Sequence, residues 1–241
     1  MDIQQRHRAL ITGASSGIGK ATALAFAQAG VDLVLLSRSK DNLLKVADEA
    51  RSHQVDVQIH PLDLTNLEQI QPAIAAIAQQ GEPITILVNN AGMGYTGTLV
   101  DTSLKDWQAV LTLNLTSVFQ CIQGILPSMR DRQQGTIINV GSIAGHQAFP
   151  GWGAYNVSKA GLIALSKTLA AEERSHGIRV TLITPGAVNT PIWDTDTVQA
   201  DFNRTSMLTP EIVAQTIVQA ALLPAQAVID ELVVMPSAGA L

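Results

Sequence analysis

The sequence predicts an α/β fold: one doubly wound parallel β-sheet flanked by helices on both faces. Short apolar runs alternate with longer segments of helical period from one end of the 241 residues to the other. Hydrophobic residues make up 46% of the chain but aromatic residues only 4%, so Ala, Val, Leu and Ile must form most of the core. This composition is typical of strands buried beneath Ala-rich helices. No repeat or linker-like stretch divides the chain, so we expect a single domain over residues 1–241.

Seven short apolar runs, each bounded by turn residues, are predicted as strands. In chain order they are Ala9–Thr12, Leu33–Ser37, Val55–Pro61, Ile84–Asn89, Thr136–Val140, Val180–Thr184 and Glu231–Met235. Between them lie six segments whose apolar residues recur at helical spacing. These predicted helices are Ile18–Ala29, Asp41–His53, Leu67–Gln79, Leu104–Arg130, Ala154–Ser175 and Pro210–Leu222. Alternation in this order implies βαβ crossovers, and therefore a parallel sheet.

Capping residues and glycines mark the ends of the predicted helices. Asp41 and Thr65 occupy positions where N-caps are expected. Helix exits are expected at four glycines: Gly30, Gly81, Gly135 and Gly177.

Residues 187–209 form the longest irregular segment, between a predicted strand and a predicted helix. They include several polar residues together with Trp193 and Phe202. A segment this long in a compact domain is often functional, so we expect a lid or substrate-binding loop. The alternative is a surface insertion with a short helix of its own.

Composition and charge exclude several classes of protein. The formal net charge of −5 argues against a nucleic-acid partner, because phosphate binding needs a basic surface. The lone Cys121 rules out an intramolecular disulfide and fits a reducing compartment. The polar start Met1–Arg8 leads directly into a strand, and no 18-residue window is apolar throughout, so neither a signal peptide nor a membrane span is expected. We therefore expect a cytoplasmic protein. The histidines and carboxylates show no metal-ligand spacing.

The segment Thr12–Gly19 follows the first predicted strand and opens the first predicted helix. Gly13 permits a tight turn, Gly17 lets backbone N–H groups approach a pyrophosphate at the helix N-terminus, and Gly19 allows close packing of helix against strand. The spacing G-x3-G-x-G differs from the usual dinucleotide fingerprint G-x-G-x-x-G. A cluster of glycines required only by a turn is the alternative.

The second predicted strand ends in hydroxyls and cations at the position where a dinucleotide fold recognises the adenosine ribose. Arg38 lies 19 residues beyond Gly19, and Ser37 and Lys40 flank it. An acidic residue here would repel a 2′-phosphate, whereas arginine presents a planar donor fork that suits phosphate. The residues favour NADP(H) over NAD(H). The alternative is a solvated basic loop.

Tyr155 and Lys159 lie four residues apart, so their side chains share one helical face. An ammonium group beside the phenol favours the phenolate, so we expect a lowered Tyr155 pKa. Tyr155 could then give a proton to a carbonyl oxygen during reduction and take it back during oxidation. A Tyr and a Lys at this spacing also occur together by chance.

Two further polar residues fit a catalytic group. Ser142 follows a strand at the edge where open α/β sheets bind ligands, and its hydroxyl could hold the substrate oxygen near Tyr155. Asn114 lies within an apolar helical stretch, where its amide needs partners. It either holds a water that relays protons to Lys159 or satisfies a kinked backbone.

Taken together, these motifs closely resemble the short-chain dehydrogenase/reductase family in its single-domain form. The glycine spacing is that family's version of the fingerprint, and Asn114, Ser142, Tyr155 and Lys159 match its catalytic tetrad. Asn89–Gly92 matches its structural and cofactor-lining motif, and Pro185–Thr190 matches its nicotinamide-side loop. Asp63 and Leu64 lie where the family contacts adenine. The resemblance implies a Rossmann-type fold and a cofactor site formed by Gly13, Ser15, Ser16, Gly17, Ile18, Gly19, Ser37, Arg38, Asp63, Leu64, Asn90, Ala91, Gly92, Tyr155, Lys159, Pro185, Gly186, Val188 and Thr190.

The expected function is NADP(H)-dependent, reversible reduction of a small ketone or aldehyde to an alcohol. A 3-oxoacyl-[acyl-carrier-protein] reductase and a short hydroxy-acid dehydrogenase are alternatives. The former is weakened because residues 232–239 lack the Gly-Gly pair that many such reductases have near their ends. A non-catalytic dinucleotide sensor is an alternative of another class. The resemblance also implies a homo-oligomer, a dimer or tetramer built on the helices 104–130 and 154–175.

Several residues near the tetrad receive weaker expectations. Phe149, Trp152 and Trp193 could form an apolar wall for the substrate, although Trp152 could equally serve packing. His146 and Gln147 are expected to be polar loop residues without a role.

Overall fold

The computed structural model describes residues 7–200 and 202–239 and has a seven-stranded parallel sheet in the order β3-β2-β1-β4-β5-β6-β7. The strands are β1 (Arg8–Thr12), β2 (Asp32–Ser37), β3 (Val57–Pro61), β4 (Ile86–Asn89), β5 (Gly135–Val140), β6 (Ile178–Pro185) and β7 (Glu231–Val234). All seven coincide with predicted strands, and every neighbouring pair is parallel. The predicted doubly wound fold is therefore confirmed.

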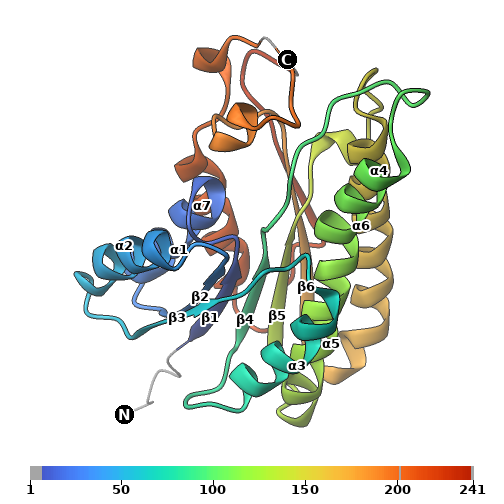
Figure 1. Ribbon diagram of the computed structural model, residues 1–241. Coiled ribbons are helices and arrows are strands. Elements are labelled where there is room, and N and C mark those ends of the chain that lie inside the picture. The colour runs from blue at the N-terminus through green and yellow to red at the C-terminus, as the bar shows by residue number, and fades with distance from the viewer. Residues whose placement is uncertain (1–6, 201, 240–241) are drawn as a thin grey trace.

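Helices cover both faces of the sheet (Figure 1). On one face lie α1 (Gly17–Gln28), α2 (Lys40–Arg51) and α7 (Pro210–Ala221). On the other lie α3 (Leu67–Ala78), α5 (Ser117–Asp131) and α6 (Gly153–Glu173), while α4 (Leu104–Leu111) precedes α5. Each face has its own apolar layer, centred on Phe26 and Ile217 on the first and on Ile74 and Ile125 on the second. Aliphatic residues make up most of both layers, as the composition predicts.

Three predicted helix ends are wrong. Helix α2 is capped by Ser39, whose hydroxyl accepts from Asn42 N, and not by Asp41. Helix α3 has Asn66 and not Thr65 as its N-cap. Gly135 begins β5, and the left-handed conformation after α5 is taken by Gln133, with φ of 51°. The other three predicted helix exits, at Gly30, Gly81 and Gly177, do adopt positive φ.

The predicted helix 104–130 is not one regular helix. Between α4 and α5 the residues Thr112–Thr116 form a π-helical turn. By length and composition alone, the run Leu104–Asp131 could cross a membrane, which the sequence analysis did not predict. In this fold the residues Val118, Ile122 and Ile125 pack beneath the sheet, and a core helix passes the same test.

Cys121 lies in the same apolar layer and is 1% exposed. Burial raises the pKa of its thiol to about 12, which keeps the thiol protonated and unreactive.

Candidate active site

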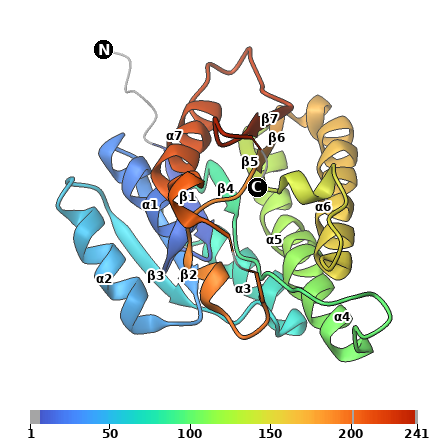
Figure 2. The same cartoon turned by 90° about the horizontal axis from the view of Figure 1, so that it is seen from above.

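The predicted site residues gather at the carboxyl ends of the central strands. The strand order reverses between β1 and β4, and such a switch point is where open α/β sheets bind ligands. Figure 2 looks down on this edge, which the segment 187–209 crosses. The described residues of that segment include two short 3-10 helices, Pro191–Asp194 and Arg204–Ser206.

The glycine turn after β1 lies so close to neighbouring backbone atoms that it leaves no room for side chains at Gly13 and Gly19. A Cβ on Gly19 would lie 2.2 Å from Gly13 O, and one on Gly13 would lie 2.9 Å from Ala91 Cα. Gly13 also has a φ of +66°, which favours glycine. The tight turn and the close packing of helix on strand therefore match the expectations for Gly13 and Gly19.

Asn90 and Ala91 join this turn to β4. Asn90 Nδ2 donates to Thr12 O at 3.0 Å and to Gly13 O at 3.3 Å. The backbone N–H groups of Asn90 and Ala91 both donate to Thr12 Oγ1, at 3.0 and 3.1 Å. Thr12 is a residue that sequence reasoning missed, because its partners lie 78 and 79 positions away.

The N-terminus of α1 faces this turn. Ser16 is its N-cap residue and is exposed, and Gly17–Lys20 include no acidic side chain. Gly17 lies close to the segment 187–209, since a Cβ there would lie 3.3 Å from the Thr190 side chain. Backbone N–H groups and the helix dipole at this position suit a phosphate. The glycine turn and the N-terminus of α1 therefore fit the phosphates of a dinucleotide, and side chains at Gly13 and Gly19 would disrupt this turn by colliding with Ala91 and Gly13 O.

On the side where adenosine is predicted to bind, Arg38 follows β2 and is exposed. The positive charge of Arg38 interacts with the Asp63 carboxylate. That carboxylate accepts hydrogen bonds from Thr65 N and Oγ1, at 2.9 Å each. These hydrogen bonds, with a smaller contribution from Arg38, lower the pKa of Asp63. Leu64, expected to contact adenine, has a side chain that packs in the core with 5% exposed, which leaves only its backbone for such a contact.

The predicted catalytic residues meet above β5 and on α6. Ser142 follows β5 and hydrogen-bonds the Tyr155 phenol. Lys159 Nζ lies 5.7 Å from the centroid of the Tyr155 ring and donates to Val140 O at 3.0 Å. Tyr155 and Lys159 share one face of α6, as their spacing predicts.

The expected lowering of the Tyr155 pKa is wrong for this structure. Burial raises the pKa of the phenol, and the hydrogen bond from Ser142 opposes that rise only in part. Burial also lowers the pKa of Lys159 to about 8. Desolvation penalises the charged form of each group, and this outweighs the effect of their proximity. A protonated phenol is the form that can donate a proton to a carbonyl oxygen.

Asn114 lies in the π-helical turn and is 1% exposed. Its Oδ1 accepts from Met93 N at 2.8 Å, and its Nδ2 donates to Met93 O at 2.9 Å and to Ser158 Oγ at 3.1 Å. Both amide hydrogens are therefore engaged within the protein. The side chain fixes the segment after β4 against α6, which corresponds to the structural alternative for this residue.

The segment Pro185–Thr190, expected on the nicotinamide side, is fixed at both ends. Gly186 N donates to Val234 O at 2.8 Å, and a Cβ on Gly186 would lie 2.8 Å from Pro236 Cδ. At the other end Arg204 donates to Asn189 Oδ1 at 2.8 Å and to Thr190 O at 2.9 Å. Val188 is buried, and it pairs with Leu208. Sequence reasoning missed Arg204, which no local motif distinguishes.

The segment 187–209 is also fastened to the loop after β4. Thr96 N donates to Thr197 O at 2.9 Å, and Gln199 N donates to Thr96 Oγ1 at 2.7 Å. Thr197 Oγ1 donates to Gly94 O at 2.8 Å. This segment therefore lies over the site and not away from it.

A row of aromatic rings runs outward from the Tyr155 phenol. Trp152 contacts Tyr155 with ring centroids 5.4 Å apart, and Trp193 contacts Trp152 at 5.8 Å. Phe202 continues the row at 5.5 Å from Trp193. We call these four residues the aromatic row. Trp152 and Trp193, both predicted to form part of an apolar wall for the substrate, thus lie side by side in this row, next to Tyr155.

Comparisons with known proteins point to one family. Residues 7–201 match the sequence model of the short chain dehydrogenase family. The chain is 40% identical over 183 residues to the 3-oxoacyl-[acyl-carrier-protein] reductase FabG of Thermotoga maritima, which covers 76% of this chain and 74% of that protein. It is 33% identical to the sepiapterin reductase of Chlorobaculum tepidum, over 97% of this chain and 98% of that protein.

Among solved structures, the alcohol dehydrogenase from the archaeon Thermococcus sibiricus, complexed with 5-hydroxy-NADP, has a similar fold. Its TM-score is 0.88 at 28% sequence identity, and the match covers 96% of this chain and 97% of that chain.

Proposed function

The chain belongs to the short-chain dehydrogenase family of oxidoreductases, and from that premise we propose that it is an NADP(H)-dependent carbonyl reductase. The observation that carries the proposal is the group of Ser142, Tyr155 and the buried Lys159 beside a glycine turn that fits a dinucleotide. The cofactor supplies the hydride when it is bound. Arg38, exposed after β2, supports a preference for NADP(H), because its guanidinium suits the 2′-phosphate. The similar alcohol dehydrogenase of Thermococcus sibiricus is complexed with 5-hydroxy-NADP, which also favours this cofactor.

Each catalytic side chain has one proposed role. Ser142 holds the substrate oxygen by a hydrogen bond. Tyr155 donates its phenolic proton to that oxygen, and its raised pKa keeps the proton in place until transfer. Lys159 presents a positive charge near the phenol and orients the ribose of the cofactor. Asn114 positions the segment after β4 through Met93.

The aromatic row supports a substrate with an apolar, flat or bulky substituent on the carbonyl carbon. Trp152 is in contact with Tyr155, so such a substituent would rest on aromatic surface while its oxygen meets the phenol. The 40% identity to a 3-oxoacyl-[acyl-carrier-protein] reductase favours a second candidate, the reduction of 3-oxoacyl thioesters.

We further propose a homo-oligomer. Phe119 on α5 and Val157 on α6 are large apolar residues with 42% and 46% exposed, on the two helices expected to associate. Sedimentation velocity measures the subunit count directly. A monomer at micromolar concentration would contradict this proposal and leave the proposed chemistry intact.

The experiment that tests the function is loss of NADPH absorbance, and separately of NADH absorbance, with aryl ketones, β-keto esters and 3-oxoacyl thioesters. Turnover of ketones with NADPH supports the main proposal, and preferential turnover of thioesters supports the second. No turnover with any of these carbonyls, despite tight NADPH binding by calorimetry, would contradict both.

A further inference from the structure

The turn that carries Ser142 extends to His146. Ser142 caps the 3-10 turn Ile143–Gly145, with its Oγ accepting from Ala144 N at 3.2 Å. Gly145 N donates to Ser142 O, and His146 N donates to Ile143 O, both at 2.9 Å. Because these hydrogen bonds overlap, Ser142 and His146 belong to one unit. A displacement of the His146 end is therefore transmitted to the Ser142 end.

His146 is tied to the edge strand of the sheet. Its Nε2 contacts Oε1 of Glu231, the first residue of β7, although the two residues are 85 positions apart. The side chains are 35% and 22% exposed, so the contact is partly withdrawn from water. The sequence assigns His146 no role.

The same carboxylate oxygen holds a second element of the site. Thr184 Oγ1 donates to Glu231 Oε1 at 2.9 Å, and Thr184 is completely buried. Thr184 directly precedes Pro185, where the segment expected on the nicotinamide side begins. Glu231 therefore joins the turn that carries Ser142 to the end of β6.

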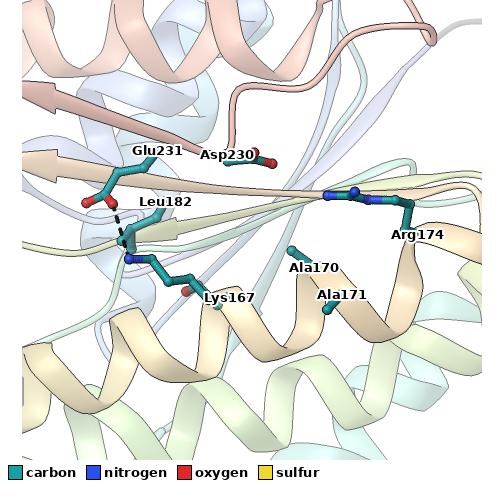
Figure 3. A pocket seen from close by; sticks show the side chains of 8 residues that line it. Lys167, Ala170, Ala171, Arg174, Leu182, Asp230 and Glu231 are labelled. Atoms are coloured by element: carbon teal, nitrogen blue, oxygen red, sulfur yellow. Dashed lines mark ion pairs between the residues drawn. The ribbon is translucent and has the colours of Figure 1, made fainter.

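The other side of this carboxylate faces solvent. Lys167 on α6 lies 3.9 Å from Glu231 Oε2 and is 65% exposed. Figure 3 shows this pair at one end of a surface hollow of about 480 Å³, which Asp230 and Arg174 also line. Lys167 is thus a partner of Glu231 that does not lead to the site.

We propose that Glu231 and His146 are positioning residues: together they fix the Ser142 hydroxyl relative to the Pro185–Thr190 segment, so that the substrate oxygen and the cofactor are held in register. The carboxylate accepts from both sides of the site, and loss of either link frees the turn without removing a reacting group. This inference rests on the proposed function insofar as Ser142 holds the carbonyl oxygen.

The test compares His146→Ala, His146→Gln, Glu231→Ala and the control Lys167→Ala. His146→Ala and Glu231→Ala each break a link between the Ser142 turn and the end of β6. Each should therefore lower kcat by roughly 5- to 20-fold, with the Kd of NADPH unchanged. His146→Gln keeps an amide donor and should recover part of the loss. Lys167→Ala removes the outward partner and should leave kcat unchanged.

Two further measurements separate positioning from general stability. In a double-mutant cycle, His146→Ala combined with Glu231→Ala should cost little more than either change alone, because the two residues act as one unit. Hydrogen exchange should rise in peptides spanning 141–147 in both variants, and not in Lys167→Ala. Exchange needs no substrate, so it tests the link even if the proposed reaction is wrong.

Two results would overturn the inference. One is an unchanged kcat in His146→Ala. The other is a loss of activity in Glu231→Ala that follows only the fraction of folded protein, with no change in exchange at 141–147.

Discussion

Lys159 Nζ lies 5.7 Å from the centroid of the Tyr155 ring while it donates a 3.0 Å hydrogen bond to Val140 O. Lys159 is buried and Tyr155 is half-buried, and desolvation controls both pKa values: that of Tyr155 is raised and that of Lys159 is lowered to about 8. The phenol therefore stays protonated through the physiological range. Lys159 is the group of the pair that changes charge near neutral pH.

This pKa predicts a pH dependence for the capture of NADPH. Below pH of about 8 Lys159 carries its charge, and above it the neutral amine no longer attracts the cofactor. We expect kcat/KM for NADPH, which reports the ionisations of the free enzyme, to fall with a one-proton slope above that pH.

Two lysine variants check the assignment. Lys159→Met should remove this fall of kcat/KM at alkaline pH, which we call the alkaline limb, together with most of the activity. Lys167→Met, on the same helix but exposed, should leave the limb in place. A wild-type profile that stays flat to pH 10 would contradict the role of Lys159.

Tyr155→Phe removes only the proton that the mechanism transfers. We expect kcat for carbonyl reduction to fall by roughly 10²- to 10⁴-fold. The Kd of NADPH, measured by calorimetry, should change by no more than about twofold, because the glycine turn and Arg38 are untouched. Turnover at the wild-type rate would rule out Tyr155 as the acid.

The fold was predictable because each strand is a short apolar run whose signal is local. Helix ends were harder to predict than strands. Ser39 and Asp41 are both residue types that cap helices well, and the choice between them depends on geometry that the sequence does not encode locally. The π-helical turn at Asn114 was not predicted, because a single turn of wider period leaves the apolar repeat around it nearly unchanged.

The site was predictable where its motifs are contiguous and not where its contacts are long-range. The spacing of Tyr155 and Lys159 placed them on one face, but burial, which sets the direction of both pKa shifts, is a property of the assembled fold. Likewise His146 meets Glu231 only because the turn after β5 and the start of β7 approach each other in the sheet.

Arg38→Asp should reverse the cofactor preference. The arginine is exposed at the end of β2, where it can reach a 2′-phosphate, and the carboxylate would repel that group and accept from ribose hydroxyls. A charge-assisted hydrogen bond contributes about 1.5 to 3 kcal/mol, so we expect kcat/KM for NADPH to fall by roughly 10- to 100-fold, while that for NADH rises.

Lys45→Asp is the matched control for this change. Lys45 is an exposed cation on α2, so the substitution alters the net charge equally without touching the end of β2. The ratio of the two kcat/KM values should stay near that of the wild type. A shift in this ratio as large as that of Arg38→Asp would mean that the net charge of the protein, and not Arg38 itself, sets the preference for NADPH over NADH.

Trp193 should determine how well the enzyme accepts bulky carbonyls. It lies within the aromatic row between Trp152 and Phe202, and its Nε1 donates to Val188 O at 2.7 Å. An aromatic contact contributes about 0.5 to 1.5 kcal/mol, so Trp193→Ala should raise KM for an aryl ketone by roughly 2- to 10-fold. KM for a small aliphatic ketone, which cannot reach the ring, should change little.

Two variants separate contact with the substrate from support of the 187–209 segment. Trp193→Phe keeps an aromatic face but loses the hydrogen bond to Val188 O, so it should preserve most of the preference for the aryl ketone. Trp107→Phe, on α4 and outside the aromatic row, should change neither KM. If Trp193→Ala impairs both ketones equally, the ring acts by holding the segment over the site, and the substrate rests on other residues.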